Sequence, residues 1–339
     1  MQAITTNTRK EWLNCRRKGV GGSDVGAILG LNRWRTALDV FNDKTGREFQ
    51  DVSNQPAVHF GTILEDIVAK EFEQRTGMKV QRIKQTLVIG ENGWMRANID
   101  RAIVNPDIAR TVRVRSEDAW KEDGRLLTTD MGLECKTASA YTAAQWGASQ
   151  EDEIVAGAVF SEHEVPVSYE LQCQWYMAIT GARVWYLAVL IGGQDYRIYE
   201  IQRNEILINT IIERCREFWF NNVLADVAPE PVSAADIEKV YPDSNGEMME
   251  ALADVVIAIG EIRNIDAQMR SLKLEREQYA EQIKEAIAER DGLLIGGERA
   301  ATWKSSSRST VDTKMLKQRY PNVYDECLRE TKTRTLRIY

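Results

Sequence analysis

The stretch "LECKT", residues 133–137, places two charged side chains inside a segment that otherwise reads as a buried strand. Successive side chains of a strand point to opposite faces, so Glu134 and Lys136 share one face while Cys135 points the other way, into the core. Two charges buried on one face cost free energy unless they pair or contact a metal ion. The segment therefore predicts a strand that carries a polar site.

Two further carboxylates precede this strand. Asp100 lies in "WMRANIDRAIV", residues 94–104, which reads as one strand, and Glu65 lies in "GTILEDIVAKEFEQRTG", residues 61–77, which reads as an amphipathic helix. Oxygen ligands of this kind suit Mg²⁺ or Mn²⁺. A lysine beside them can hold or deprotonate a water, which is the chemistry that phosphodiester hydrolysis needs.

Each of these features has a simpler interpretation when it is taken alone. Glu134 and Lys136 could be a solvent-facing ion pair, Glu65 a surface carboxylate of its helix, and Asp100 the residue that ends a strand. The order of the features favours a site, because a helix glutamate, a strand aspartate and an E-x-K strand are followed by a helix that carries glutamines.

Composition limits the classes of protein that fit. The 339 residues contain five scattered cysteines, no CxxC pair and only two histidines. A zinc knuckle, a disulfide framework and catalysis by several histidines are therefore not supported, and a reducing cytoplasm is the expected location. No apolar run is long enough for a membrane span, and the first residues do not resemble a signal peptide.

The pattern of elements predicts an α/β fold with a mixed sheet and two domains. Residues 1–228 form the first, with Ser23 or Asp24 as the cap of a helix that ends at Gly30, and with a hairpin or flap in the long insert at residues 101–133. The helix at 61–77 is expected to bury Ile63, Ile67, Val68 and Phe72.

Residues 229–339 form the second domain. It begins with the linker "PEPVS" and continues as a long, coiled-coil-like helix over residues 248–287. From Arg299 to Tyr339 the net charge is +6, whereas the whole chain carries −7, so the tail is basic on an acidic body. Such a tail suits contact with DNA or with a partner protein, and equally an exposed face of an oligomerisation arm.

The chain resembles the YqaJ-type viral recombinases, the group of lambda exonuclease, within the PD-(D/E)xK nuclease superfamily with its restriction-endonuclease-like core. The matching pieces are "RKGVGGSDVGAILG", "HFGTILEDIVAKEFEQRTG", "MRANIDRAI", "LECKT" and "YELQCQWYMAITGARVWYLAVLIGG". Each piece is a weak signal by itself, and five in this order make a specific one. The proline that usually precedes the aspartate is absent here, and the region beyond about residue 228 has no counterpart in the compact exonucleases.

The resemblance implies roles for individual residues. Asp100, Glu134 and the backbone carbonyl of Cys135 would be metal ligands, Lys136 would be the catalytic lysine, and Glu65 would complete the site or bind a second metal ion. The expected ion is Mg²⁺, which Mn²⁺ can replace, and the cysteines do not match the iron–sulfur pattern of related nucleases.

Three more residues are assigned by the same resemblance. Gln174 would be the active-site glutamine, and Arg17 with Ser23 would hold the 5′-phosphate of a DNA end. The simpler interpretations are a solvated base for Arg17 and a plain helix cap for Ser23, although a helix N-terminus also attracts phosphate.

The resemblance implies a metal-dependent 5′-to-3′ exonuclease that resects double-stranded DNA ends in phage-type recombination. It further implies a single-strand annealing protein as partner and a homo-oligomer such as a ring trimer. The alternatives are a nicking or structure-specific endonuclease, which uses the same metal site, a DNA-binding assembly protein with a vestigial site, and a structural coiled-coil protein.

Overall fold

The structure is a computed structural model that describes residues 1–48, 55–104, 111–116, 119–126, 130–151, 154, 165–330 and 333–338. Contacts divide the chain into two compact units, Met1–Asp236 and Ile237–Tyr339. The predicted domain boundary after residue 228 lies shortly before this division. Residues 229–236 join the first unit because Asp236 is buried there and accepts a hydrogen bond from the Thr36 hydroxyl (2.9 Å).

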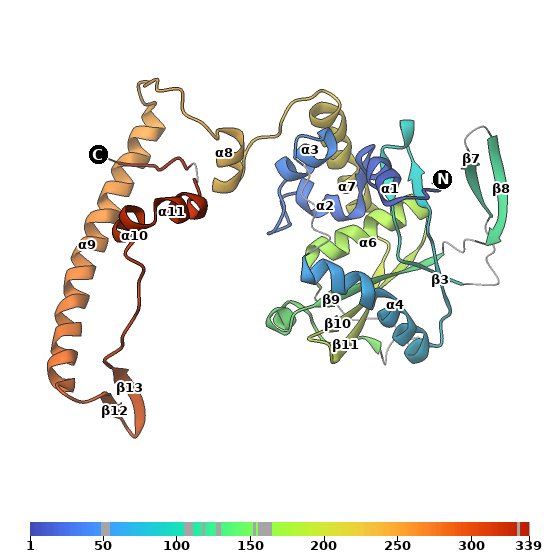
Figure 1. Cartoon of the computed structure of the whole chain (residues 1–339). Helices are drawn as coiled ribbons and strands as arrows, with labels where there is room; N and C mark the ends of the chain where they lie inside the picture. The colour runs from blue at the N-terminus through green and yellow to red at the C-terminus, as the bar shows by residue number, and fades with distance from the viewer. Residues whose placement is uncertain are drawn as a thin grey trace. The chain divides into compact units, whose positions relative to one another are not determined.

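A five-stranded mixed sheet carries the LECKT segment (Figure 1). The strand order is β11-β10-β9-β6-β3, in which β9 and β10 are parallel and the other neighbours are antiparallel. The strands are β3 (Val80–Arg82), β6 (Arg101–Ile103), β9 (Met131–Ala138), β10 (Val184–Ile191) and β11 (Asp195–Gln202). The α/β fold with a mixed sheet is confirmed.

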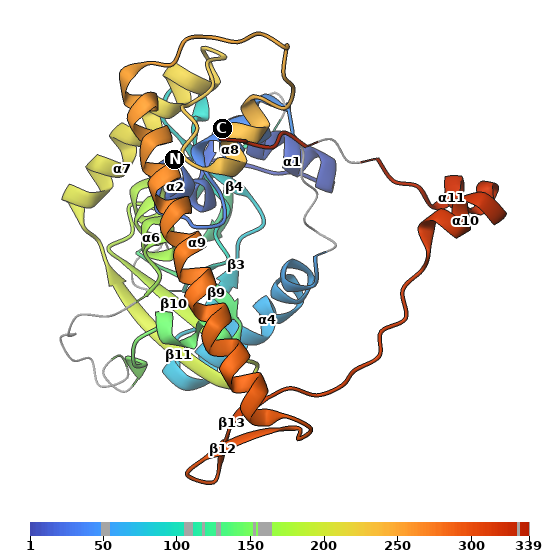
Figure 2. The same ribbon diagram turned by 90° about the vertical axis from the view of Figure 1, so that its left-hand side faces the viewer.

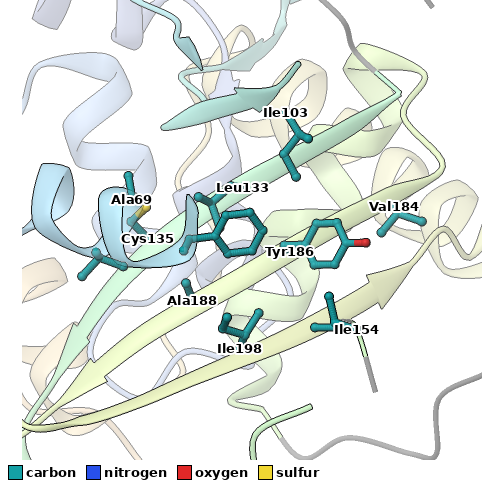
Figure 3. Close-up of a cluster of buried hydrophobic side chains, with 11 residues drawn as sticks. Ala69, Ile103, Leu133, Cys135, Ile154, Val184, Tyr186, Ala188 and Ile198 are labelled. Carbon is teal, nitrogen blue, oxygen red and sulfur yellow. The ribbon is translucent and has the colours of Figure 1, made fainter. Parts of the chain in front are cut away.

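Two helices pack against this sheet, one beside the apolar face of strand β9 and one beside its polar face. Helix α4 (Pro56–Thr76) contributes Val68, Ala69 and Phe72 to a buried apolar cluster that includes Leu133 and Cys135 of β9 (Figure 3). Helix α6 (Val167–Thr180) contacts the alternate residues of β9. The prediction that Cys135 faces the core while Glu134 and Lys136 face the other way is confirmed.

A second sheet of six strands has the order β2-β5-β4-β1-β7-β8. Its strands are β1 (Gln2–Ile4), β2 (Val20–Gly21), β4 (Thr86–Ile89), β5 (Met95–Ala97), β7 (Thr111–Ser116) and β8 (Ala119–Leu126). The antiparallel β7–β8 pair at its edge confirms the predicted hairpin.

The predicted single strand at 94–104 is wrong, because β5 and β6 belong to different sheets. Polar side chains in the connection explain the break. Asn98 accepts hydrogen bonds from the Thr86 hydroxyl (2.7 Å) and the Trp12 indole (3.3 Å), and Asp100 accepts one from the Cys135 amide (2.8 Å). These side-chain bonds replace ladder bonds, so the chain passes from one sheet to the other at the candidate site.

The helix predictions are confirmed in type and need correction in detail. The N-cap of α2 (Gly22–Ile28) is Gly21, whereas Asp24 lies in the first turn and accepts a hydrogen bond from the Gly21 amide (2.9 Å). Helix α4 begins at Pro56, where proline is favoured at the first helical position. Ile63 and Ile67 of α4 are about half exposed (51% and 53%), so only part of the predicted apolar face enters the core.

The other elements of the first unit are mostly helical. Glycines in the left-handed region end α3 and α6, as their sequences predict. The elements are α1 (Arg9–Arg17), α3 (Ala37–Thr45), η1 (Glu91–Gly93), η2 (Ala140–Gln145), α7 (Glu205–Glu217), η3 (Phe218–Val223) and α8 (Ala234–Val240), which crosses the boundary.

The second unit is built around the 35-residue helix α9 (Ala253–Ile287), which starts five residues later than the predicted 248. A hairpin of β12 (Gly292–Ile295) and β13 (Glu298–Thr302) follows the C-terminal end of α9 (Figure 2). Helices α10 (Thr313–Arg319) and α11 (Pro321–Cys327) come next. None of the helices in the described parts of the chain combines the length and apolar composition that crossing a bilayer requires.

Candidate active site

Glu134 and Lys136 form a pair on the α6-facing side of β9. The Lys136 ammonium donates to Glu134 Oε1 (2.5 Å), and the Glu134 side chain is only 3% exposed. The pair is therefore not the solvent-facing ion pair of the simpler interpretation. Its position in the sheet follows from strand alternation, which sends Leu133 and Cys135 into the apolar cluster on the other face.

Asp100 lies directly before β6, which is the strand next to β9 in the sheet. In the β6–β9 register Arg101 is opposite Leu133, so one further step brings Asp100 opposite Glu134. Asp100 Oδ2 accepts a hydrogen bond from the Cys135 amide. The N–H and C=O of one strand residue point to the same side of the strand, so the Cys135 carbonyl also faces Asp100. The structure thus brings together three of the four predicted metal-binding groups.

The two carboxylates carry more negative charge than their neighbours neutralise. Burial, and then the nearby Glu134, raise the pKa of Asp100 well above its usual value. Glu134 Oε2 is buried and has no hydrogen-bond partner among the described residues. An orphaned, buried carboxylate oxygen beside a second, partly buried carboxylate is the arrangement that a divalent cation would satisfy. The residues present therefore fit the implied metal ion.

Glu65, the fourth predicted ligand, is held by an arginine. Glu65 Oε1 accepts from Arg101 Nη1 (2.5 Å), and the same nitrogen donates to the Asp100 carbonyl oxygen (2.6 Å). Asp66 binds the other end of the Arg101 guanidinium. Within the described residues no group of three or more carboxylate, thiol or imidazole side chains converges enough to hold an ion. Glu65 is thus beside the site but directed to Arg101.

Lys136 is a cation in this arrangement. Burial alone would lower its pKa, but Glu134 and Asp100 raise it above the usual value. The ammonium also lies 4.8 Å from the ring centroid of Tyr169, within range of a cation–π contact. Of the two roles considered for this lysine, holding a water or deprotonating it, the charged state fits the first.

The structure places Gln172, and not the predicted active-site glutamine Gln174, beside Glu134 and Lys136. Gln172 donates to Glu134 Oε1 (2.6 Å) and accepts from Lys136 (3.2 Å). Gln174 instead donates to the Gln202 carbonyl (2.7 Å) and accepts from the Asn204 amide (3.0 Å). Two residues apart on an α-helix means about 200° of rotation, so only one of these glutamines can face β9.

Sequence reasoning also missed Tyr176, to whose hydroxyl Gln172 donates (2.8 Å). Residues four apart lie on one face of a helix, so Gln172 and Tyr176 form a polar pair on one face of α6. That spacing is the signal that distinguishes Gln172 from Gln174. Arg101 was missed because its partners lie 35 and 36 residues earlier.

The start of α2 adjoins the same site. A Cβ on Gly22 would come within 2.6 Å of the Tyr176 ring and 3.1 Å of Gln172 Cγ, so only glycine permits this close approach. The neighbouring Ser23 is exposed, and its hydroxyl accepts a hydrogen bond from Arg16 (3.1 Å). Arg17, which is predicted to hold the 5′-phosphate together with Ser23, has its Nε 3.9 Å from Asp43.

Several cationic side chains surround Asp24, the residue that follows Ser23. Asp24 is fully buried and contacts Lys44 (2.6 Å), Arg35 (2.7 Å) and Arg16 (3.7 Å). Burial alone would raise the pKa of Asp24, but the three cations hold it well below its usual range. With Arg17, Asp39 and Asp43 included, four cations face three carboxylates, so this group of residues keeps a net positive charge.

Sequence comparison identifies a family model and a relative. The model of the YqaJ-like viral recombinase domain matches residues 11–183, which include Asp100, Glu134, Lys136 and Gln172. The protein YqaJ of Bacillus subtilis (strain 168) is 36% identical over 338 residues, a span that covers 98% of this chain and 94% of that protein.

Structure comparison finds more distant similarity. An alkaline exonuclease of Laribacter hongkongensis (LHK-Exo) has a TM-score of 0.44 and 16% identity, with 64% of this chain and 94% of that chain covered. A phage related exonuclease from Haemophilus somnus 129PT has a TM-score of 0.40 and 14% identity, with coverage of 63% and 99%.

Asp100→Asn should stabilise the metal-free protein. A carboxyl whose folded-state pKa is raised contributes stability below its unfolded pKa of about 3.9, and this contribution is lost as the pH rises through the folded value. In EDTA at pH 7 the melting temperature should rise by roughly 2–4 °C, which corresponds to about 1 kcal/mol in a domain of this size. The difference should shrink as the pH falls toward 4.

Asp66→Asn is the matched control, because Asp66 pairs with Arg101 and lacks a buried carboxylate neighbour. It should give no such rise. A lower melting temperature for Asp100→Asn than for wild type at pH 7 would contradict the electrostatic reading of the site.

Proposed function

Because this chain belongs to the YqaJ-like viral recombinase family, we propose that it is a metal-dependent deoxyribonuclease that hydrolyses phosphodiester bonds at the β9 site. The observation that carries the proposal is the pair of the buried Glu134 and the partly buried Asp100, with one orphaned oxygen on Glu134 and a lysine beside them. A pair that serves only the fold would gain nothing from leaving a buried carboxylate oxygen unbound.

The metal ion would be held by oxygen atoms. Asp100, Glu134 and the Cys135 carbonyl are the proposed ligands, and Glu65 would join them after release from Arg101. Oxygen-only sites of mixed carboxylate and carbonyl ligands favour Mg²⁺ and accept Mn²⁺. When bound, such an ion supplies Lewis acidity that makes a water more nucleophilic and stabilises the leaving oxygen.

The chain's own residues do the positioning. Lys136, kept charged by two carboxylates, can donate a hydrogen bond to the attacking water or to a phosphate oxygen. Gln172 holds the Glu134 and Lys136 side chains by bonding to both, and Tyr176 fixes Gln172 in turn. Gln172 is therefore a positioning residue in this proposal.

The proposed substrate is the end of a DNA duplex, degraded from 5′ to 3′. Support comes from the net positive corner formed by Arg16, Arg17, Arg35 and Lys44, with Ser23 exposed at its edge and Gly22 in contact with Gln172. Arginine and hydroxyl donors that converge in this way suit a terminal phosphate. We further propose cytoplasmic action with a single-strand annealing protein, as the family resemblance implies.

Asp100→Ala, Glu134→Ala and Lys136→Ala should each abolish cleavage. Loss of a charge that stabilises the transition state costs several kcal/mol, so each rate should fall at least about 10³-fold. The assay uses linear duplexes labelled at the 5′ or the 3′ end, with Mg²⁺, with Ca²⁺ and with EDTA. Mg²⁺ should support cutting, whereas Ca²⁺ should support binding alone.

A near-wild-type rate in any one variant would remove that residue from the mechanism, and full activity in EDTA would end the metal proposal. Covalently closed circular duplex is the control substrate. Its cleavage would indicate an endonuclease at the same site.

Gln172→Ala and Gln174→Ala provide a matched pair on one helix. Gln172→Ala should lower kcat by about 10- to 100-fold, since it removes hydrogen bonds to two charged groups worth roughly 1.5–3 kcal/mol. Gln174→Ala should lower thermal stability and leave kcat per folded molecule close to wild type. The reverse pattern of kcat values would restore Gln174 as the active-site glutamine.

Arg16→Ala and Ser23→Ala should remove most of the preference for 5′-phosphorylated ends. Loss of a charge-assisted contact costs about 1.5–3 kcal/mol, so the rate ratio between 5′-phosphate and 5′-hydroxyl duplexes should fall roughly 10- to 100-fold. Arg17→Ala is measured beside them, and Arg33→Ala, an arginine that lies over Trp34, is the control for lost charge. If none of the three changes the ratio, the phosphate is not held at this corner.

A further inference from the structure

Helix α9 carries an unpartnered apolar stripe with a regular spacing. Residues three and four apart in alternation occupy one face, in the manner of coiled-coil a and d positions. The a positions are Val255, Ile262, Met269, Arg276 and Ile283. The d positions are Ala258, Ile265, Leu272, Tyr279 and Ala286.

The stripe is exposed over its whole length in the second unit. Ile265, Met269, Leu272 and Tyr279 are 51–64% exposed, although each is a large apolar or aromatic side chain. A helix with so many exposed apolar positions at a constant spacing needs a partner surface to bury them. Val256, Ile257 and Leu274 are also exposed but lie outside the stripe, and pairing through it would leave them uncovered.

We propose that the occupant of this stripe is α9 of a second copy of the chain, in antiparallel orientation. The spacing repeats every seven residues from Val255 to Ala286, with Arg276 as a polar member, which is the pattern of a two-helix coil with left-handed supercoiling. The charges that flank the stripe determine the orientation.

Parallel pairing in register brings like charges together. In that arrangement each a residue faces its own copy, so Arg276 would face Arg276. The flanking g and e positions would place Glu261 beside Asp266 of the other helix. Both contacts are repulsive.

Antiparallel pairing removes these conflicts. An a residue then faces a d residue, and e faces e while g faces g. In the register that places Met269 opposite Leu272, Ile262 faces Tyr279, and Arg276 faces Ile265, along which its aliphatic stem can lie. Arg276 in the a position thus favours one orientation, as single polar residues do in coiled coils.

The same register pairs opposite charges. Asp266 at an e position faces Lys273 at an e position of the other helix, and twofold symmetry repeats the pair. At the g positions, Glu261 faces Gln282 and Gln268 faces Glu275, so no like charges oppose one another. Among the flanking positions this register contains only neutral or attractive contacts.

Mixed-disulfide formation tests orientation and register together in the full-length chain. The background is Cys327→Ser, because Cys327 is exposed whereas Cys15, Cys135, Cys173 and Cys215 are buried. Ile262→Cys and Tyr279→Cys variants, one carrying a size tag, are mixed and oxidised. The expected product is the 262–279 heterodimer.

Each variant oxidised alone should stay uncrosslinked, since the two copies of residue 262 would lie about 25 Å apart along the axis at 1.5 Å per residue. Asn264→Cys with Gln278→Cys is the matched control, at the same axial level but on the outer face of the coil. Homodisulfides at 262 and at 279 would show parallel pairing and overturn the proposal, as would no cross-link in any mixture.

Charge exchange gives an independent test by light scattering. Asp266→Lys should raise the dissociation constant of the α9 pair roughly tenfold or more, because two attractive contacts become repulsive. The double variant Asp266→Lys with Lys273→Asp should restore it. Met269→Glu should dissociate the pair, whereas Ser271→Glu on the outer face should not. A chain that remains monomeric at ~50 µM, or an assembly unaffected by Met269→Glu, would refute pairing through this stripe.

Discussion

The buried Glu134 of β9, with Lys136 on the same strand and Asp100 beside it, is the constraint on which the site depends. A buried charge is tolerated on β9 because the opposite face of the strand is packed: Leu133 and Cys135 lie in the apolar cluster under α4. Strand alternation therefore separates a face that stabilises the fold from a face that carries the candidate site. Helix α6 follows the same division, since it presents Gln172 to Glu134 of β9 and the indole of Trp175 to the Arg96 carbonyl.

The site also joins parts of the chain that have separate structural roles. Asp100 lies where the chain passes from one sheet to the other, and Gly22 lets the start of α2 touch α6. Gln172 therefore contacts Glu134 and also lies against the start of α2, which carries Asp24. An enzyme that holds a terminal phosphate while it cuts a nearby bond needs a division between a positive corner and a metal-binding carboxylate pair.

The sequence was sufficient where the geometry is local. Alternation placed Glu134 and Lys136 on one face, and the glycine that closes the segment 61–77 marks the end of α4. Sequence analysis failed where the position of a side chain depends on which face of a helix it occupies, or on a partner that is distant in the sequence. Gln172 and Gln174 differ only in the helix face they occupy, and Glu65 is held by Arg101, which its own surroundings in the sequence do not indicate. Ile63 and Ile67 on α4 are about half exposed and show the same limit. Hydrophobic periodicity predicts which residues form the apolar face of a helix, but not how much of that face the rest of the protein covers.

The α9 stripe and a ring-shaped assembly would have to be independent of each other. An antiparallel pair of identical helices has twofold symmetry. A single twofold contact of this kind forms a closed dimer and cannot add a third copy. A threefold ring, which the family resemblance implies, would therefore need contacts from the nuclease unit. If both assemblies form, each α9 would link copies from two different rings, since a helix within one ring of three would leave the third copy without a partner. The position of Arg276 in the stripe is then the feature that matters, because it disfavours the parallel bundles that a threefold ring could otherwise gather on its own axis.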